Sequence, residues 1–469
     1  MNTLGLKYFG IFFLIISFFS FFNIIYSYYF NLLNNLNNYI YTFGITLIIG
    51  IFLIVFKKYK YEKIPLFDRI LIVLIGYLVL PFLISIPYFF NLDNIGLINC
   101  YFEAVSGFTS TGFTIFKELD QLDKTLILWR SSSQWIGGLY FLFSILLLID
   151  LFDENLKRSL TNYISLNSSE IFKQVFKIIV IYLLMTIIIF VLLKAVNLRS
   201  YDAYNYSLSI ISSGGFMPND NFDETFGTDL SKIILSISML FSFFSLFFIY
   251  NLIFFKKKNI NYLSEDINIL IYLLIVIAIS FIFFNYDNNF LNILVSISSS
   301  VSNIGISFDQ VPKNLVLFFL LLVILGGSFF STSSGLRVIK VLNLSKFSIN
   351  NLLSHSKPNQ IYSNKLSLNK ISVNIEDINK YFFAIIIFII SLFLISIFLT
   401  VSNLDFETSF KLGILTIMNT VNSEMYDLAN LDFYNFNIFS KISLIIFMII
   451  GRIELLSIII LLKKFLFKN

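Results

Sequence analysis

The chain has 469 residues, of which 57% are hydrophobic and only 13% charged, and its mean hydropathy is +0.83. This composition excludes an ordinary soluble globular protein and indicates a protein with several membrane spans. A single cysteine, Cys100, and a single histidine, His355, exclude an internal disulfide, a multi-cysteine metal site and a site built from several histidines within the chain.

The apolar runs predict an all-α membrane protein with ten transmembrane helices. The first run, Tyr8–Phe30, is too long for a signal-peptide core and lacks a small-x-small cleavage site, so we interpret it as an uncleaved span. Each later run approaches or exceeds the roughly 20 residues that a spanning helix needs. These runs are residues 39–56, 69–90, 126–149, 172–196, 232–255, 267–284, 314–341, 381–401 and 442–465.

Positive charge gathers at every second connection between the predicted spans. The basic residues there are Lys57, Lys58, Lys60, Lys63, Lys157, Arg158, Lys256, Lys257, Lys258, Arg337, Lys340, Lys346, Lys463, Lys464 and Lys468. Because Lys and Arg accumulate in cytoplasmic loops, this pattern predicts that both termini are cytoplasmic. The same rule accounts for the formal net charge of +5 without a nucleic-acid partner.

Taken in chain order, the spans group into a hairpin and a repeat. Residues 1–63 form the predicted N-terminal transmembrane hairpin. Units of span, loop and span follow at 64–153, 154–258, 259–348 and 378–469, and a cytoplasmic linker at 349–377 precedes the last of them. Repeats that each lack a closed core assemble around a shared axis, so we expect four pseudo-repeated units around a central pore.

The polar loops of the four units enter from the outer side and follow one pattern. The first, Phe102–Thr114, reads FEAVSGFTSTGFT, a short amphipathic helix followed by Thr, Ser and Gly. Residues 204–220, 291–311 and 407–430 hold the corresponding place in the later units. Irregular backbone at membrane depth persists only inside protein or beside a wet cavity, so these loops indicate an ion filter of carbonyl and hydroxyl oxygens.

Glycine suits such a filter because it reaches positive φ without steric cost. Our alignment matches Gly112, Gly214 and Gly305, each following hydroxyl or amide side chains and a short helix whose C-terminal dipole end would face a cation. Three loops in register argue against ordinary turns. The predicted filter residues, which would bind the cation, are Thr109, Ser110, Thr111, Gly112, Ser212, Ser213, Gly214, Ser302, Asn303, Ile304, Gly305, Asn422, Ser423 and Glu424.

The fourth loop departs from this pattern because no glycine occurs between Gly413 and Gly451. Alignment places Glu424 where the glycine should be, after Asn422 and Ser423. A glutamate at positive φ would cost roughly 1–3 kcal/mol of backbone strain. Two interpretations stay open: the carboxylate lies in or beside the mouth, or the fourth loop has relaxed and holds no ion.

The eighth predicted span carries helix-breaking residues in its middle, where Leu325–Leu336 reads LGGSFFSTSSGL. Clustered glycines and hydroxyls weaken a helix, although a packing kink with hydroxyls bonded back to the helix is the alternative. We interpret the stretch as a flexible plug beneath the filter. Its predicted gate residues are Gly326, Gly327, Ser331, Thr332 and Gly335.

The tenth predicted span carries two charges in its middle, Arg452 and Glu454. Ionisable residues at membrane depth are costly and indicate function by default. The two side chains are two positions apart on a helix and do not face each other, so a partner must come from another unit. Either Arg452 forms a salt bridge between repeats, or it lies near the cavity and regulates cation flow.

These stretches resemble the Trk/Ktr/HKT superfamily of potassium transporters, and among them the TrkH-type subunit most closely. The resemblance rests on FEAVSGFTSTGFT at Phe102–Thr114, WRSSSQWIGGL at Trp129–Leu139, ISSGGF at Ile211–Phe216, GGSFFSTSSGLRVIKVL at Gly326–Leu342 and GRIELLSIIILL at Gly451–Leu462. It implies potassium uptake across a bacterial cytoplasmic (inner) membrane through a filter of four loops, with an intramembrane gate at Gly326–Gly335.

The resemblance also implies roles and partners. The family's basic residue after the gate matches Arg337, and its tenth-span arginine matches Arg452. The family pattern implies K⁺ as the transported ion, no cofactor in this chain, a homodimer, and a separate cytoplasmic nucleotide-binding ring of the TrkA type. Glu424 departs from the family's fourth filter glycine, which puts the preference for potassium over sodium in question.

The sequence also bears on alternatives to potassium uptake. A polytopic glycan polymerase would need a large outer loop with catalytic Arg or His, and the sequence has no such loop, so we predict that the chain is not an enzyme. A sodium-permeable or weakly selective cation transporter, and a non-conducting sensor or scaffold with the same fold, both remain open because of the altered fourth loop.

Overall fold

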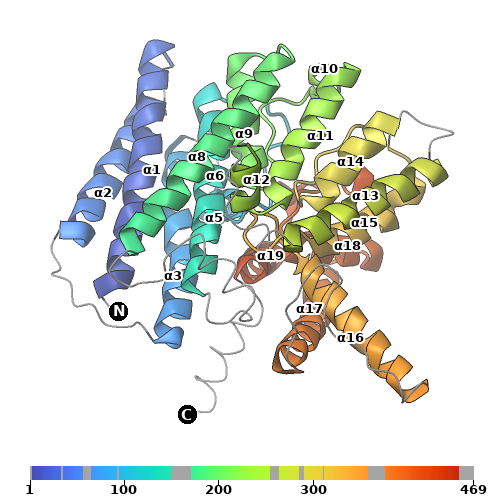
Figure 1. Ribbon diagram of the computed structural model, residues 1–469. Coiled ribbons are helices and arrows are strands. Elements are labelled where there is room, and N and C mark those ends of the chain that lie inside the picture. The colour runs from blue at the N-terminus through green and yellow to red at the C-terminus, as the bar shows by residue number, and fades with distance from the viewer. Residues whose placement is uncertain are drawn as a thin grey trace.

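The computed structural model describes residues 3–32, 35–55, 65–91, 95–148, 171–253, 264–284, 290–309, 311–356 and 375–453, and these form a bundle of helices (Figure 1). The main helices are α1 (Thr3–Tyr29), α2 (Leu36–Val55), α3 (Leu66–Ile84), α4 (Ile86–Asn91), α5 (Leu97–Phe108), α6 (Lys124–Leu147), α8 (Ile171–Ala195), α9 (Ser200–Ile211), α10 (Phe222–Thr225), α11 (Asp229–Phe243), α12 (Leu246–Ile253), α13 (Ser264–Phe284), α14 (Phe290–Val301), α15 (Val316–Ile324), α16 (Val338–Ser356), α17 (Ile375–Val401), α18 (Phe406–Ile417) and α19 (Ile438–Arg452).

Short elements complete the described fold. Two strands, β1 (Leu325–Gly326) and β2 (Leu336–Arg337), pair in parallel with Leu325 opposite Leu336. Single 3₁₀ turns are η5 (Lys313–Leu315), η6 (Glu424–Tyr426) and η7 (Phe433–Asn435).

A long helix, a helix of 12 residues and a further helix recur along the chain. The 12-residue helices are α5, α9, α14 and α18. Before them, α1 and α2 lie side by side at one flank of the molecule (Figure 1). Gly10 and Gly50 permit this closeness, since a β-carbon on Gly10 would lie 3.1 Å from the Gly50 carbonyl oxygen.

Among the described residues, six helices are long and apolar enough to cross a membrane. Two of the predicted spans are not continuous helices. The run 232–255 is divided between α11 and α12, and the run 314–341 is divided between α15 and α16 by the two strands. The last predicted span is described only as far as Ile453. The described helices therefore do not confirm the count of ten spans. The interruption within 314–341 agrees with the broken helix that the sequence predicted there, whereas the division of 232–255 was not predicted.

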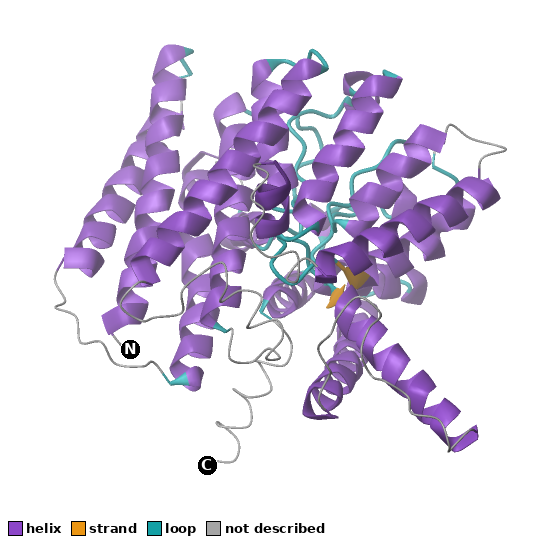
Figure 2. Cartoon of the chain, viewed as in Figure 1, coloured by secondary structure: helices purple, strands orange, loops and turns teal. Residues whose placement is uncertain are grey.

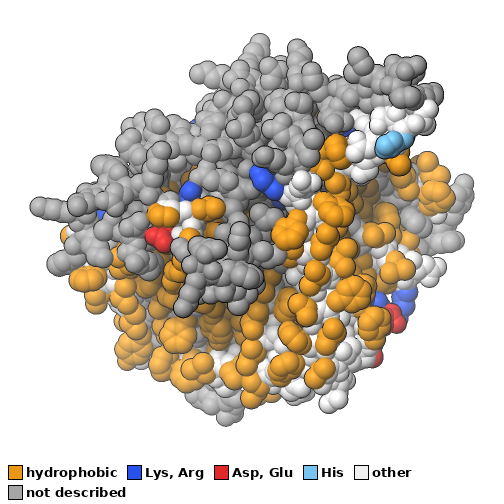
Figure 3. Space-filling model, turned by 90° about the horizontal axis from the view of Figure 1, so that it is seen from below, with side chains coloured by type: hydrophobic (Ala, Val, Ile, Leu, Met, Phe, Trp, Pro, Cys, Tyr) orange, Lys and Arg blue, Asp and Glu red, His pale blue; other side chains and the backbone are white. Residues whose placement is uncertain are grey.

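The described surface is strongly apolar. Large hydrophobic side chains lie next to one another over much of the face in Figure 3. Phe176 of α8 is 67% exposed and Leu317 of α15 is 72% exposed. Water does not tolerate apolar surface on this scale, whereas lipid does. The chain is therefore a multi-pass membrane protein.

Helix α6 forms the centre of the first half of the bundle and is buried on every side from Thr125 to Leu147. Indole and phenol groups on it reach the surrounding helices: Trp129 Nε1 donates to the Ile84 carbonyl oxygen at 3.0 Å, and Trp135 Nε1 donates to Thr186 Oγ1 at 3.0 Å. A helix buried on every side can carry polar side chains only where neighbouring segments supply hydrogen-bond partners. The polar side chains of α6 described below have such partners.

Glycines let the inner helices touch the ends of the 12-residue helices. A β-carbon on Gly137 of α6 would overlap the carbonyl oxygen of Phe108, the last residue of α5. A β-carbon on Gly451 of α19 would overlap the carbonyl oxygen of Ile417, the last residue of α18. Because backbone atoms cannot rotate away, both contacts demand glycine.

We predict that Gly137→Ala and Gly451→Ala destabilise the protein by about 1–3 kcal/mol, the usual cost of overpacking. Thermal loss of the monodisperse peak in detergent would measure this. Gly44→Ala in α2 is the matched control, because nothing lies within 4 Å of its added methyl group. Alanine in that helix should be neutral or slightly stabilising. Equal melting behaviour of all three variants would contradict the close approach.

Candidate functional site

The helices α5, α9, α14 and α18 end in the same turn. One residue past the C-cap, a non-glycine residue adopts the left-handed conformation, at φ 56°, 56°, 60° and 49° for Ser110, Ser213, Asn303 and Asn419. The next amide donates to the carbonyl five residues before it: Thr111 to Ser106, Gly214 to Ser209, Ile304 to Ser299 and Thr420 to Leu415, at 2.8–3.0 Å. This hydrogen-bond pattern is a Schellman cap. Because the same cap occurs four times, it aligns the four segments in one register. We call these segments the converging loops: residues 109–114, 212–217, 302–307 and 418–423.

The caps correct the predicted alignment. Two residues after the left-handed position stand Gly112, Gly215, Gly305 and Val421. The second-loop counterpart is thus Gly215 rather than Gly214. In the fourth loop the counterpart is Val421 rather than Glu424, which lies three residues further on in η6.

Positive φ occurs at only two of the aligned glycines, Gly112 at 84° and Gly305 at 86°. Gly214 and Glu424 are not among the positive-φ residues of the described chain, so the strain expected at Glu424 is absent. The left-handed turn itself is formed by Ser and Asn, which tolerate this conformation better than most non-glycine residues.

The converging loops meet in the middle of the molecule, where loop segments gather between the helices in Figure 2. A β-carbon on Gly112 would lie 3.2 Å from Gly215 Cα and 3.0 Å from Val421 Cβ, and one on Gly305 would lie 2.6 Å from the Val421 carbonyl oxygen. Asn419 Nδ2 donates to Thr111 Oγ1 at 3.0 Å. All four loops therefore touch around one centre.

Two buried side-chain oxygens of the converging loops have no hydrogen-bond partner. Ser110 Oγ and Asn303 Oδ1 are fully buried and lack a hydrogen-bond partner among the described residues. A buried oxygen without a donor is costly unless something else satisfies it. A cation stripped of water would do so, because filter oxygens replace its hydration shell.

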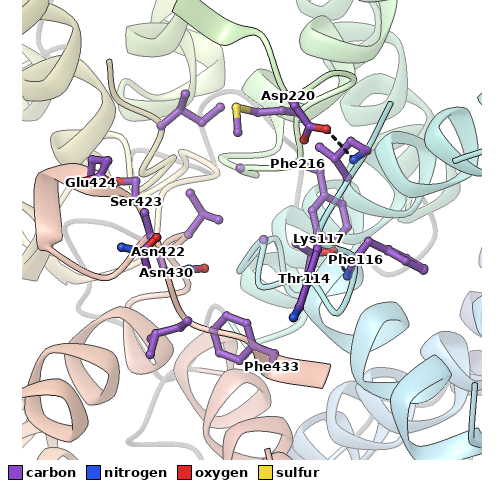
Figure 4. A pocket seen from close by; sticks show the side chains of 18 of the residues that line it. Thr114, Phe116, Lys117, Phe216, Asp220, Asn422, Ser423, Glu424, Asn430 and Phe433 are labelled. Atoms are coloured by element: carbon purple, nitrogen blue, oxygen red, sulfur yellow. Dashed lines mark hydrogen bonds between the residues drawn. The ribbon is translucent and has the colours of Figure 1, made fainter. Parts of the chain in front are cut away.

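A cavity of about 450 Å³ opens above the centre, and its floor includes Gly112, Gly215 and Val421. In Figure 4, Asn422, Ser423 and Glu424 line one side, facing Phe116, Lys117 and Phe216 on the other. The charged lining residues are Lys117, Arg130, Asp220, Asp309, Glu424 and Asp432. Four carboxylates against two cations favour positive ions in the cavity. Glu424 thus lies beside the mouth.

An exposed ion pair closes one side of the cavity, with Lys117 Nζ 2.7 Å from Asp432 Oδ2. Partial burial alone would raise the pKa of Asp432, but the hydrogen bond and the charge of Lys117 outweigh it and hold that pKa below its ordinary value. Asp432 therefore stays ionised at neutral pH.

Beneath the centre lies the β1–β2 loop, residues 327–335, where the sequence predicted a broken helix. Thr332 Oγ1 donates to the Ile211 carbonyl oxygen at 2.7 Å and lies 3.2 Å from Ser213 Oγ. Ser334 Oγ donates to Asn419 Oδ1 at 3.3 Å. The loop therefore touches the second and fourth converging loops from below.

Two buried arginines hold the β1–β2 loop. Arg452 donates to the Thr332 carbonyl oxygen at 3.0 Å, to Ser334 Oγ, and to the Ser212 carbonyl oxygen at 3.1 Å. Arg337 donates to the carbonyl oxygens of Ser328 at 2.9 Å and Ser333 at 3.0 Å. Among the described residues Arg452 pairs with no carboxylate, so the salt-bridge interpretation finds no support there. Glu454 lies outside them.

The predicted filter and gate residues therefore divide into two groups. The first three loops and the whole gate set lie around the centre and the loop beneath it. Asn422, Ser423 and Glu424 lie instead in the wall of the cavity. The fourth loop reaches the centre through Asn419, Thr420 and Val421, which the alignment passed over.

Sequence reasoning also missed a buried ion pair behind the first converging loop. Arg130 Nε on α6 lies 2.9 Å from Glu103 Oε1 on α5, and the two side chains are 1% and 0% exposed. Glu103 accepts from the Ile115 amide at 2.9 Å and from Thr114 Oγ1 at 3.1 Å, and Arg130 donates to Thr114 Oγ1 at 2.9 Å. The sequence did contain a signal for this ion pair, because each of the two charged residues lies among mostly apolar or hydroxyl-bearing residues of its helix.

Removing one partner of this pair should be costly. We predict that Glu103→Gln lowers stability by about 3–5 kcal/mol, because Arg130 is left buried without a counter-charge. Thermal unfolding in detergent would register the change. Lys117→Ala, which breaks the exposed pair with Asp432, is the comparison and should cost no more than about 1 kcal/mol. A Glu103→Gln variant as stable as Lys117→Ala would refute the role of the buried pair.

Comparison with protein-family models found no match. The chain is 28% identical over 323 residues to an uncharacterized cation transporter of Methanocaldococcus jannaschii, and this match spans 65% of each chain, just under two thirds of that relative. It is 25% identical over 346 residues to the Trk system potassium uptake protein TrkH of Escherichia coli, covering 69% of this chain and 71% of that one. Its identity to TrkG of the same organism is 23% over 428 residues, or 86% of each chain.

The fold is likewise similar to a solved one. The crystal structure of the potassium transporter TrkH from Vibrio parahaemolyticus superposes with a TM-score of 0.80 at 21% identity, covering 97% of this chain and 98% of that chain. Together with the converging loops and the broken helix beneath them, these findings show that the chain resembles the Trk system potassium uptake proteins TrkH and TrkG in sequence and TrkH in fold.

Proposed function

We propose that the chain carries potassium, or a closely related monovalent cation, across a membrane through the centre of the converging loops. The observation that carries the proposal is the meeting of four equivalently capped loops, two of which carry buried side-chain oxygens without a hydrogen-bond partner. Named relatives that take up potassium support the choice of ion. A negative-inside potential would favour inward movement by about 2.3 kcal/mol per charge per 100 mV.

The proposed route has three parts. The cavity with four carboxylates gathers cations, the converging loops replace their water with oxygens, and the β1–β2 loop closes the route below. Thr332 and Ser334 lie directly against the converging loops, so this loop must move for an ion to leave. Arg337 and Arg452 hold it in the closed position by bonds to its carbonyl oxygens.

The proposal also covers the membrane in which the protein lies, its orientation there and its partners. Basic connections at alternate ends of the spans support a bacterial cytoplasmic membrane with both termini on the inner side. Several of those connections lie outside the described residues. A homodimer and a cytoplasmic nucleotide-binding ring of the TrkA type are further proposals, supported by the resemblance alone.

A second candidate is a weakly selective cation transporter. One observation favours it: the fourth converging loop presents Val421 where the other three present glycine. Competition between rubidium, potassium and sodium on purified protein in vesicles separates the two candidates. Preferential block of rubidium uptake by potassium supports the first, and equal block by sodium supports the second.

Gly112→Ser should weaken the preference for potassium. Its φ of 84° is strained for any side chain, at a cost of roughly 1–3 kcal/mol, and its β-carbon would press on Val421. The measurement is the sodium-to-potassium ratio needed to halve rubidium uptake. Gly96→Ser is the control, because Gly96 caps α5 at φ −61° with open space around it. An unchanged ratio in Gly112→Ser would remove the first loop from the filter.

Glu424→Gln should slow cation entry without altering selectivity, because the carboxylate lines the cavity rather than the glycine ring. The effect should be largest at low ionic strength and fade near 0.15 M salt, where the Debye length is about 8 Å. Initial uptake rates across a salt series measure it. Glu407→Gln outside the cavity, where the glutamate pairs with Lys411, is the comparison. A change in the ion preference of Glu424→Gln would return Glu424 to the filter.

A further inference from the structure

Val421 occupies the space that glycine leaves open in the three other loops. A β-carbon added to Gly112 would lie 3.0 Å from Val421 Cβ and Cγ2, one on Gly215 would lie 2.5 Å from Val421 Cβ, and one on Gly305 would lie 2.8 Å from Val421 Cγ1. A single isopropyl group that faces three glycines from three different loops must stand between them, at their common centre.

The main chain of the same residue adds to the closure. The Val421 amide donates to the Ile304 carbonyl oxygen at 3.5 Å. Ile304 belongs to the third converging loop and is one of the residues predicted to offer its oxygen to the ion. At this level an N–H group, rather than a cation, faces that oxygen.

Exposure changes sharply at Val421. This residue is partly exposed and forms part of the cavity floor. The next residues inward, Thr420, Thr111, Ile304 and Ser110, are completely buried. The open cavity therefore ends at the valine, and the oxygens without donors lie behind it.

We infer that Val421 is a hydrophobic plug that closes the ion route at the outer end of the converging loops. The inference rests on the proposed function. An isopropyl group offers no oxygen to a cation that has shed its water, and apolar constrictions exclude ions by excluding water. Passage then requires the fourth loop to withdraw, because valine is stiff about χ1 and cannot simply fold aside.

The plug is linked to the β1–β2 loop below. Asn419, two residues before Val421, accepts from Ser334 Oγ and donates to the Met448 carbonyl oxygen at 2.8 Å. Ser334 in turn accepts from Arg452. Movement of the β1–β2 loop would therefore pull on the loop that carries the valine, so that both barriers open together.

Side-chain size at position 421 should govern flux. In vesicles, Val421→Gly should raise initial rubidium uptake roughly tenfold, which corresponds to lowering the barrier by about 1.4 kcal/mol. Val421→Ala should be intermediate, and Val421→Ile should carry less than the parent chain. Val401→Ala is the matched control, since Val401 is 70% exposed at the end of α17. Equal rates in all variants would overturn the plug and leave the proposed function standing.

A second measurement needs no net flux. Because the chain has one cysteine, Cys100→Ser gives a thiol-free background in which Ser110→Cys places a thiol behind the valine. Silver ion added on the cavity side should leave this thiol free when residue 421 is Val and bind it when residue 421 is Gly, as scored by maleimide labelling after unfolding. Equal protection in the two proteins would refute the plug.

The two measurements separate the plug from the function. If neither the parent chain nor Val421→Gly carries rubidium, yet silver reaches Ser110→Cys only in the glycine variant, the plug stands and transport of cations fails. If both proteins carry rubidium equally and silver reaches the thiol in both, transport stands and the plug fails.

Discussion

Backbone that leaves a helix inside a membrane meets no water, so each of its polar groups must find a partner in the protein or in an ion. The four converging loops meet this demand first through their caps, which return two amides of every loop to the carbonyls of the preceding helix. With these amides satisfied within the cap, other groups of the loops contact neighbouring loops, as Asn419 Nδ2 does in donating to Thr111 Oγ1. One local motif, used four times, thus stabilises the loops where they leave their helices.

The same demand explains where the buried arginines lie. Arg130 and Glu103 supply the charged groups that bind Thr114 and Ile115, just after the first loop passes the centre. Arg337 and Arg452 bind the carbonyls of the β1–β2 loop, which has left the helix and cannot use the helical ladder. A guanidinium group can donate to several carbonyl oxygens at once. It can therefore stabilise a backbone segment that has left the helix and lacks helical hydrogen bonds.

The sequence predicted features that depend on local chemistry. Long apolar runs, the short helices before the loops and the helix break at Gly326–Gly335 all follow from composition over a few turns. The alignment of the four loops with one another could not be predicted from composition, because it depends on the residue at which each preceding helix ends. In the second loop Gly214 and Gly215 stand side by side, and either could be aligned. The fourth loop has no glycine to align, so the sequence alignment placed Asn422–Glu424 at the filter position. The better guide was Asn419, a residue that favours the left-handed cap.

Contacts between distant segments were beyond the sequence for a different reason. The pairing of Glu103 with Arg130 joins two helices, and the meeting of Val421 with three glycines joins four loops. Neither is visible until the helices are packed. The charges could be flagged as costly in an apolar environment, but their partners could not be named.

The four converging loops and the segments after them also differ from one another. Glycine stands at the centre in the first three converging loops, whereas the fourth has Val421. A continuous helix, α6, follows the first loop, whereas the segment after the second loop is divided between α11 and α12 and the segment after the third is interrupted by the β1–β2 loop. Ser334 and Asn419 connect the β1–β2 loop directly to the fourth converging loop. In the proposed route, the β1–β2 loop and Val421 are therefore the two features that would control passage.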